Sequence, residues 1–83
     1  MTKYRKKPVV IDAMQWTGDN KDEVLEFIGG DHWWDQDGPI LVTLEGEMRA
    51  EVGDWIIRGV KGEFYPCKPD IFAWTYDLVE GDQ

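Results

Sequence analysis

The stretch Val52–Tyr76, VGDWIIRGVKGEFYPCKPDIFAWTY, decides the fold that the sequence predicts. It carries six of the chain's aromatic residues, which number five Trp, three Tyr and three Phe in all. Two runs rich in β-forming residues, Trp55–Arg58 and Glu63–Cys67, flank the turn Gly59–Gly62, and this pattern is typical of a β-hairpin. Because large rings concentrate here, we expect the core to form around this hairpin.

The register of this hairpin follows from its turn. With Gly59–Gly62 as the loop, Arg58 lies opposite Glu63 and forms an exposed cross-strand ion pair. Ile57 then lies opposite Phe64. We therefore expect the face that carries these two residues, together with Trp55, to be buried.

A first strand, one short helix and a short helical turn are predicted around the hairpin. Residues Val9–Trp16 read as a strand, and the apolar spacing in Lys21–Ile28 predicts a short helix. Asn20 and Glu23 have the spacing of a capping box at its start. Pro69 suits the first position of a second helical turn.

A second hairpin is predicted from Ile40–Leu44 and Met48–Val52, around the loop Glu45–Glu47. The apolar pattern favours a register with three loop residues, which places most of the apolar side chains on one face. The inward pairs are Leu44/Met48, Val42/Ala50 and Ile40/Val52, and the outward pairs are Thr43/Arg49 and Leu41/Glu51. Residues Tyr76–Val79 are expected to return as a last strand.

The segment between the first helix and the second hairpin is the candidate binding site. If it is extended, adjacent side chains point to opposite faces, so Trp33 and Trp34 cannot both enter one core. Together with His32 and Asp35, they could stack a planar ligand or anchor a protein contact. The alternative is that both rings complete a small core.

No catalytic residue, cofactor or metal site is predicted. Cys67 and His32 are the chain's one thiol and one imidazole, and they are separated by 35 residues in the sequence. A buried structural cysteine is the favoured interpretation over a Cys/His catalytic pair. The acids around His32, namely Asp31, Asp35 and Asp37, lack a metal-ligand spacing. Neither a GxGxxG motif nor a P-loop occurs, and Asp54 is expected to hydrogen-bond its own turn.

Length and charge limit the remaining possibilities. The 83 residues form a single domain, 1–83, with a basic lead-in at 1–7 and a polar tail at 80–83. Four of the nine basic residues lie in that lead-in, so the rest of the chain carries five basic and 17 acidic side chains. An acidic body disfavours general binding of nucleic acid. No apolar run approaches the roughly 20 residues of a membrane helix.

Three long segments, Tyr4–Asn20, Leu44–Ala50 and Gly53–Phe72, resemble a small phage and prophage protein family known by its PGDYG motif. The motif corresponds to Val52-Gly53-Asp54-Trp55-Ile56, where the family has proline first and tyrosine fourth. The resemblance implies a phage or prophage origin and residence in the bacterial cytoplasm. It implies no reaction and no catalytic residue.

These observations predict an α+β domain. We expect a bent antiparallel sheet or small open barrel of five or six strands, with one short helix packed on one face, and a homodimer that forms through exposed sheet edges. The expected function is that of a non-enzymatic accessory protein that binds a host protein or a small molecule, with a possible counter-defence or host-modulating role. The alternatives are a virion structural or assembly component, a small hydrolase using Cys67 and His32, and an acidic mimic of DNA.

Overall fold

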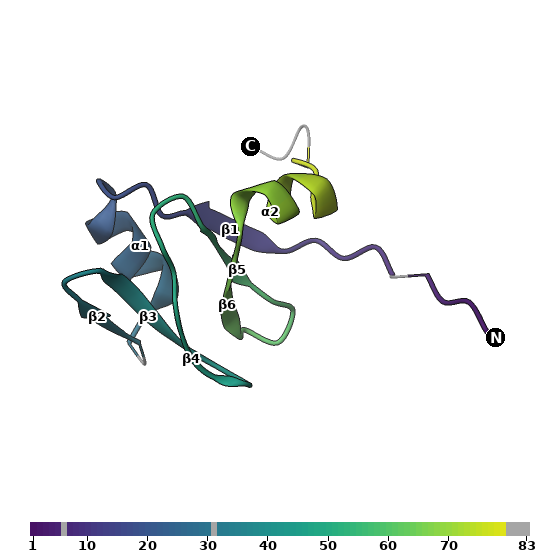
Figure 1. Cartoon of the computed structure of the whole chain (residues 1–83), viewed down its shortest axis with the longest axis horizontal. Coiled ribbons are helices and arrows are strands. Elements are labelled where there is room, and N and C mark those ends of the chain that lie inside the picture. The colour runs from purple at the N-terminus through teal and green to yellow at the C-terminus, as the bar shows by residue number, and fades with distance from the viewer. Residues whose placement is uncertain (6, 31, 80–83) are drawn as a thin grey trace.

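The computed structural model describes residues 1–5, 7–30 and 32–79, and it has six strands and two helices (Figure 1). In chain order these are β1 (Asp12–Gln15), α1 (Lys21–Ile28), β2 (Trp33–Asp35), β3 (Gly38–Thr43), β4 (Gly46–Arg49), β5 (Trp55–Arg58), β6 (Phe64–Cys67) and α2 (Pro69–Thr75). The predicted α+β class with six strands is confirmed. The polar tail predicted at 80–83 lies outside the described residues.

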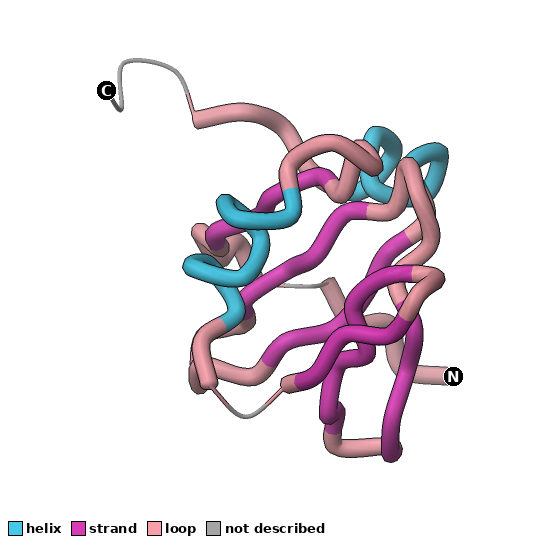
Figure 2. Tube along the Cα trace, turned by 90° about the vertical axis from the view of Figure 1, so that its left-hand side faces the viewer, coloured by secondary structure: helices cyan, strands magenta, loops and turns pink. Residues whose placement is uncertain are grey.

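The strands form two open antiparallel sheets of three strands each, and neither closes into a barrel. Sheet A has the order β1-β5-β6, and sheet B has the order β2-β3-β4. Strand β3 lies against β6, so the two sheets share an interior. Figure 2 shows both helices at the periphery of the strands.

The core lies between the two sheets and α1. Helix α1 contributes Val24 and Ile28, which are four residues apart and therefore on one helical face. Strands β3 and β5 contribute Leu41 and Ile56, both fully buried. Trp16 and Ala50 complete the buried cluster, against which lie the partly buried Met14, Phe27, Trp34 and Phe64.

Asn20 does not make the predicted capping box. Its Oδ1 accepts hydrogen bonds from the backbone N and the Oγ1 of Thr17, each at 3.0 Å. Its Nδ2 donates to the carbonyl of Gln15 at 2.8 Å. Asn20 therefore ties the start of α1 back to the end of β1, because its side chain is engaged by the preceding turn.

The central hairpin is shifted by one residue from its predicted register. Arg58 lies opposite Phe64 because Glu63 belongs to the turn. The Glu63 carbonyl accepts from the Gly59 amide at 2.8 Å, and its carboxylate accepts from the Lys61 amide at 3.0 Å. The predicted pair of Arg58 with Glu63 is therefore wrong.

The shift places Ile57 and Phe64, which were expected on one buried face, on opposite faces of sheet A. Ile57 lies opposite Tyr65 instead of Phe64. Phe64 faces the core with Ile56, whereas Ile57 lies on the outer face of sheet A. Arg58 pairs instead with Asp12 of β1, at 2.6 Å.

The outer face of sheet A is covered by α2, which begins at Pro69 as predicted. The rings of Trp55 and Phe72 stack with centroids 4.2 Å apart, and Tyr76 lies 5.1 Å from Phe72. Beneath this layer Ile57 is only 1% exposed. The segment Tyr76–Val79, predicted as a strand, has no strand pairing in the structure.

The hairpin of β3 and β4 also differs from its predicted register. Its loop has two residues, with Thr43 opposite Gly46. Thr43 Oγ1 donates to the Gly46 carbonyl at 2.6 Å and accepts from the Glu45 amide at 3.1 Å, while Gly46 adopts a φ of +110°. The shorter loop exchanges the two faces, so Leu41 is buried and Val42 points outward.

Asp54 is the one buried charged residue among the described residues, and it lies in the turn just before β5. Its Oδ2 accepts from the Glu51 amide at 2.9 Å, which confirms that the side chain caps its own turn. Its Oδ1 lies 3.3 Å from the Lys68 ammonium. Its carbonyl accepts from the Trp16 amide, and the Gly53 amide donates to the Trp16 carbonyl. These motif residues therefore connect β1 to β5.

The two edge strands of sheet A are β1 and β6, and they differ from each other. Strand β1 is shorter than the predicted Val9–Trp16, because its partner β5 ends at Arg58. The preceding residues leave the body as an extended arm (Figure 1). At the other edge, β6 contains Pro66, which has no backbone N–H to donate to a neighbouring strand.

Candidate functional site

The four predicted binding residues divide between the two faces of sheet B. Trp33 lies opposite Ile40, and Trp34 lies opposite Pro39, which is buried. Because side chains alternate along a strand, Trp34 and His32 point toward the interior. Trp33 and Asp35 point to the outer face.

The inward pair supports the fold. Trp34 meets Trp16 edge-to-face with ring centroids 4.9 Å apart. His32 Nδ1 accepts a hydrogen bond from the Val42 amide at 3.0 Å, and its ring lies edge-on to Phe64 at 5.2 Å. These contacts hold β2 against β3 and sheet B against β6.

Of the outward pair, Trp33 belongs to an exposed apolar surface. We call this surface the Trp33 face and define it as Trp33, Ile40 and Val42. Trp33 is 47% exposed and lies directly across from Ile40. Val42 lies two residues further along β3 and is 44% exposed. Residues two apart in a strand share a face, so the three side chains are neighbours. They form an apolar stripe that is open to solvent.

A charged pair borders the Trp33 face. Asp35 forms an ion pair with Arg49, which lies opposite Ile40 on β4. The hydrogen bond from the Asp37 amide, at 2.8 Å, lowers the pKa of Asp35, and Arg49 lowers it further. Asp35 therefore remains ionised, and this edge of the apolar stripe is polar and close to neutral.

Cys67 and His32 lie at different ends of β6. The His32 ring packs on Phe64, the first residue of that strand, and Cys67 is the last. Three residues of an extended strand span roughly 10 Å. Burial raises the pKa of the Cys67 thiol, and the nearby carboxylates of Asp54 and Asp70 raise it further. A reactive thiolate requires the opposite environment.

The predicted acidic cluster around His32 includes Asp31, which lies outside the described residues. Across the described part of the chain, no group of three or more His, Cys, Asp and Glu side chains could hold a metal ion. No helix in that part is long and apolar enough to cross a membrane.

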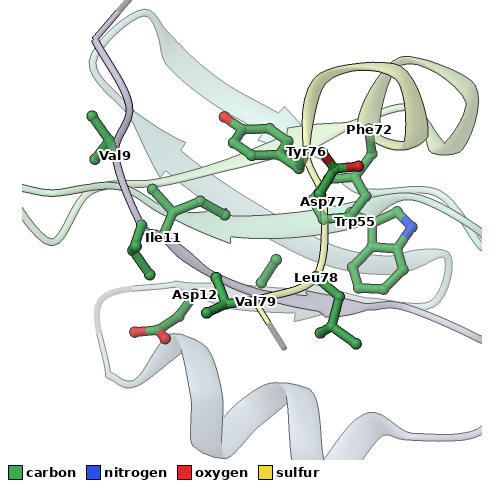
Figure 3. Close-up of a pocket in the computed structure, with 11 residues that line it drawn as sticks. Val9, Ile11, Asp12, Trp55, Phe72, Tyr76, Asp77, Leu78 and Val79 are labelled. Atoms are coloured by element: carbon green, nitrogen blue, oxygen red, sulfur yellow. The ribbon is translucent and has the colours of Figure 1, made fainter. Parts of the chain in front are cut away.

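The structure also contains a groove that sequence reasoning missed, on the outer side of sheet A (Figure 3). Two adjoining cavities of about 350 and 500 Å³ lie between the root of the N-terminal arm and the segment that follows α2. Both are lined by Val9, Ile11, Tyr76 and Asp77. The sequence feature that could have indicated this groove is the apolar segment Tyr76–Val79, which the sequence analysis interprets as a paired strand.

Comparisons of the chain with protein families, curated proteins and solved structures find no match.

Proposed function

We propose that the protein is a non-enzymatic binding module that contacts a protein partner through the Trp33 face. The observation that carries this proposal is the exposure of Trp33 beside Ile40 and Val42, on a sheet face that no other element covers among the described residues. Tryptophan is enriched among the residues that dominate binding energy at protein interfaces. The adjacent pair of Asp35 and Arg49 supplies the polar rim that such interfaces usually have.

A protein fits this surface better than a small molecule does. Small-molecule sites are concave and bury most of the ligand, with a few polar groups that converge on it. The Trp33 face is instead one face of a three-stranded sheet, where Asp35 and Arg49 pair with each other and Glu47 lies opposite Val42. A broad partner could cover the stripe and leave Asp35 and Arg49 at its edge.

The biological setting of the proposal comes from the sequence resemblance to a phage and prophage family. On this proposal the module acts in the bacterial cytoplasm, and its partner is a host protein. A counter-defence or host-modulating role would follow from that pairing.

The test uses two exposed tryptophans as a matched pair. The protein and its variants Trp33→Ala and Trp74→Ala are immobilised, and the proteins retained from a bacterial lysate are identified by mass spectrometry. Trp74 is 93% exposed on α2, away from sheet B, so it controls for the loss of an exposed ring. A retained protein is then purified, and its affinity is measured by calorimetry.

We expect Trp33→Ala to weaken the purified interaction at least tenfold, which is the effect typical of an interface hot spot. Trp74→Ala should leave it within twofold. The reverse pattern would move the interface to α2 and reject the Trp33 face. Detection of the protein in purified phage particles, with no host protein retained, would favour the virion component instead.

A further inference from the structure

The N-terminal arm, residues 1–11, makes an unusual appendage for so small a domain. Every described residue from Met1 to Val10 is exposed, including the apolar Tyr4, Val9 and Val10. Ten extended residues reach about 33 Å, and Figure 1 shows the arm projecting away from the body. The arm carries four basic side chains, whereas the rest of the chain has 17 acidic and five basic ones.

The groove on sheet A offers complementary chemistry. Its apolar lining includes the rings of Trp55, Phe72 and Tyr76 and the side chain of Leu78, which is 89% exposed. Its charged lining consists of the carboxylates Asp12, Glu63 and Asp77 and one ammonium group, Lys7 of the arm's own root. Asp12 is already paired with Arg58.

We propose that the arm of one copy of this protein lies in the groove of a second copy, and that the exchange is reciprocal. The arm combines basic residues with the apolar Tyr4 and Val9, and the groove presents apolar rings beside carboxylates. Each arm leaves the body at the wall of the groove, which Val9 and Ile11 form (Figure 3). A two-fold axis beside this wall therefore places each arm over the other copy's groove, and the assembly closes as a dimer.

The geometry of the arm root opposes docking within one chain. Pro8 restricts Lys7 to extended conformations, so the chain cannot reverse sharply at that point. The root already forms one wall of the groove, and an arm that filled its own groove would have to fold back upon that wall. The arm of a second copy enters the groove without having to fold back upon its own root.

Strand β1 supports the same arrangement. Among the described residues it pairs with β5 on one side only, so its other edge can accept an added strand. The arm continues directly from β1, and two such segments can run antiparallel across the two-fold axis. This inference does not depend on the Trp33 face, which lies on the outer face of the other sheet.

The first experiment measures the dimer dissociation constant by analytical ultracentrifugation of the full chain. Leu78→Lys introduces into the groove a charge of the same sign as the arm, and Leu44→Lys is its control, because Leu44 is equally exposed at 89% on the β3–β4 loop. We expect Leu78→Lys to raise the dissociation constant at least tenfold and Leu44→Lys to change it less than twofold. The constant for the unmodified chain should also rise with salt concentration.

The second experiment identifies what the arm contacts. A chain with Tyr4→Cys is mixed with a separate chain with Leu78→Cys, each also carrying Cys67→Ser, and the mixture is oxidised. We expect a disulfide-linked pair that contains one copy of each chain. The pair should form more slowly when the chain with Leu78→Cys also carries Val79→Lys, which adds a positive charge beside the cross-linking position. A monomeric chain at all concentrations, a dimer that Leu78→Lys leaves intact, or no cross-link between the two chains would each overturn the proposal.

Discussion

The two sheets differ in how many of their faces the chain covers. On the outer face of sheet A, Ile57 is 1% exposed, and the same face carries the aromatic layer of Trp55, Phe72 and Tyr76. On the outer face of sheet B, Val42 is 44% exposed beside Trp33. Both residues are β-branched and central in their hairpins, so local sequence does not separate them. The difference in burial between Ile57 and Val42 therefore depends on α2, the helix that follows β6.

The largest expected effect compares these two residues directly. Ile57→Ala should lower the free energy of unfolding by about 2–5 kcal/mol, because it leaves a cavity between sheet A and α2. Val42→Ala should change it by about 0.5 kcal/mol, as an exposed substitution does. Urea denaturation of both variants measures the two values. Equal losses would mean that the outer face of sheet B is covered in solution.

A second pair of variants tests the junction of the two sheets. Both Gly38 and Gly46 have a positive φ, but a Cβ at Gly38 would lie 3.1 Å from Trp16 Nε1 and 3.2 Å from the Ala50 carbonyl, whereas at Gly46 it meets nothing. Gly38→Ala should therefore cost about 1–3 kcal/mol more than Gly46→Ala, since it adds overpacking to the same backbone strain. Thermal denaturation of the two variants checks this difference, and equal melting temperatures would contradict it.

A third prediction concerns the turn that closes sheet A. Asp54→Ala should cost about 1–3 kcal/mol, because it leaves the Glu51 amide without its buried acceptor. Glu51→Ala removes only an exposed partner of Lys68 and should cost less than Asp54→Ala. Chemical denaturation compares the two. A larger loss from Glu51→Ala would show that the ion pair, and not the turn, stabilises this end of the sheet.

The smallest expected effect is a pH dependence of the aromatic layer on sheet A. Burial, with the hydrogen bond to Tyr76, raises the pKa of Tyr65 to about 12. An unfolded tyrosine titrates near 10, so this contribution to stability is complete below pH 10 and is lost as the pH rises toward 12. Denaturation between these pH values should show a decline that Tyr65→Phe reduces. An unchanged decline in that variant would assign it to other groups.

Much of the fold could be predicted because local signals decide it. Pro69 marks the start of α2, and the apolar spacing in Lys21–Ile28 gives α1 its bounds. Asp54 was recognised as a turn residue because its position after Gly53 has few other interpretations. These features depend on neighbours in the sequence, so no tertiary information is needed.

The registers of both hairpins could not be predicted, because each depends on side chains that enter the turns. Glu63 lengthens one loop through its carboxylate, and Thr43 shortens the other through its hydroxyl. A shift of one residue moves every side chain to the opposite face. That is why Val42 was expected inside and Leu41 outside. The division of the binding segment between two faces follows instead from strand alternation, which the sequence does predict.

Pro66 has a consequence for how the protein associates. A sheet that grows at both edges can polymerise without limit, and many small β proteins must guard against such fibres. In sheet A the β6 edge lacks a donor at Pro66, so strand addition is confined to β1. If a strand of a second copy were to add at β1, growth of sheet A would end there, because the opposite edge of each copy carries Pro66.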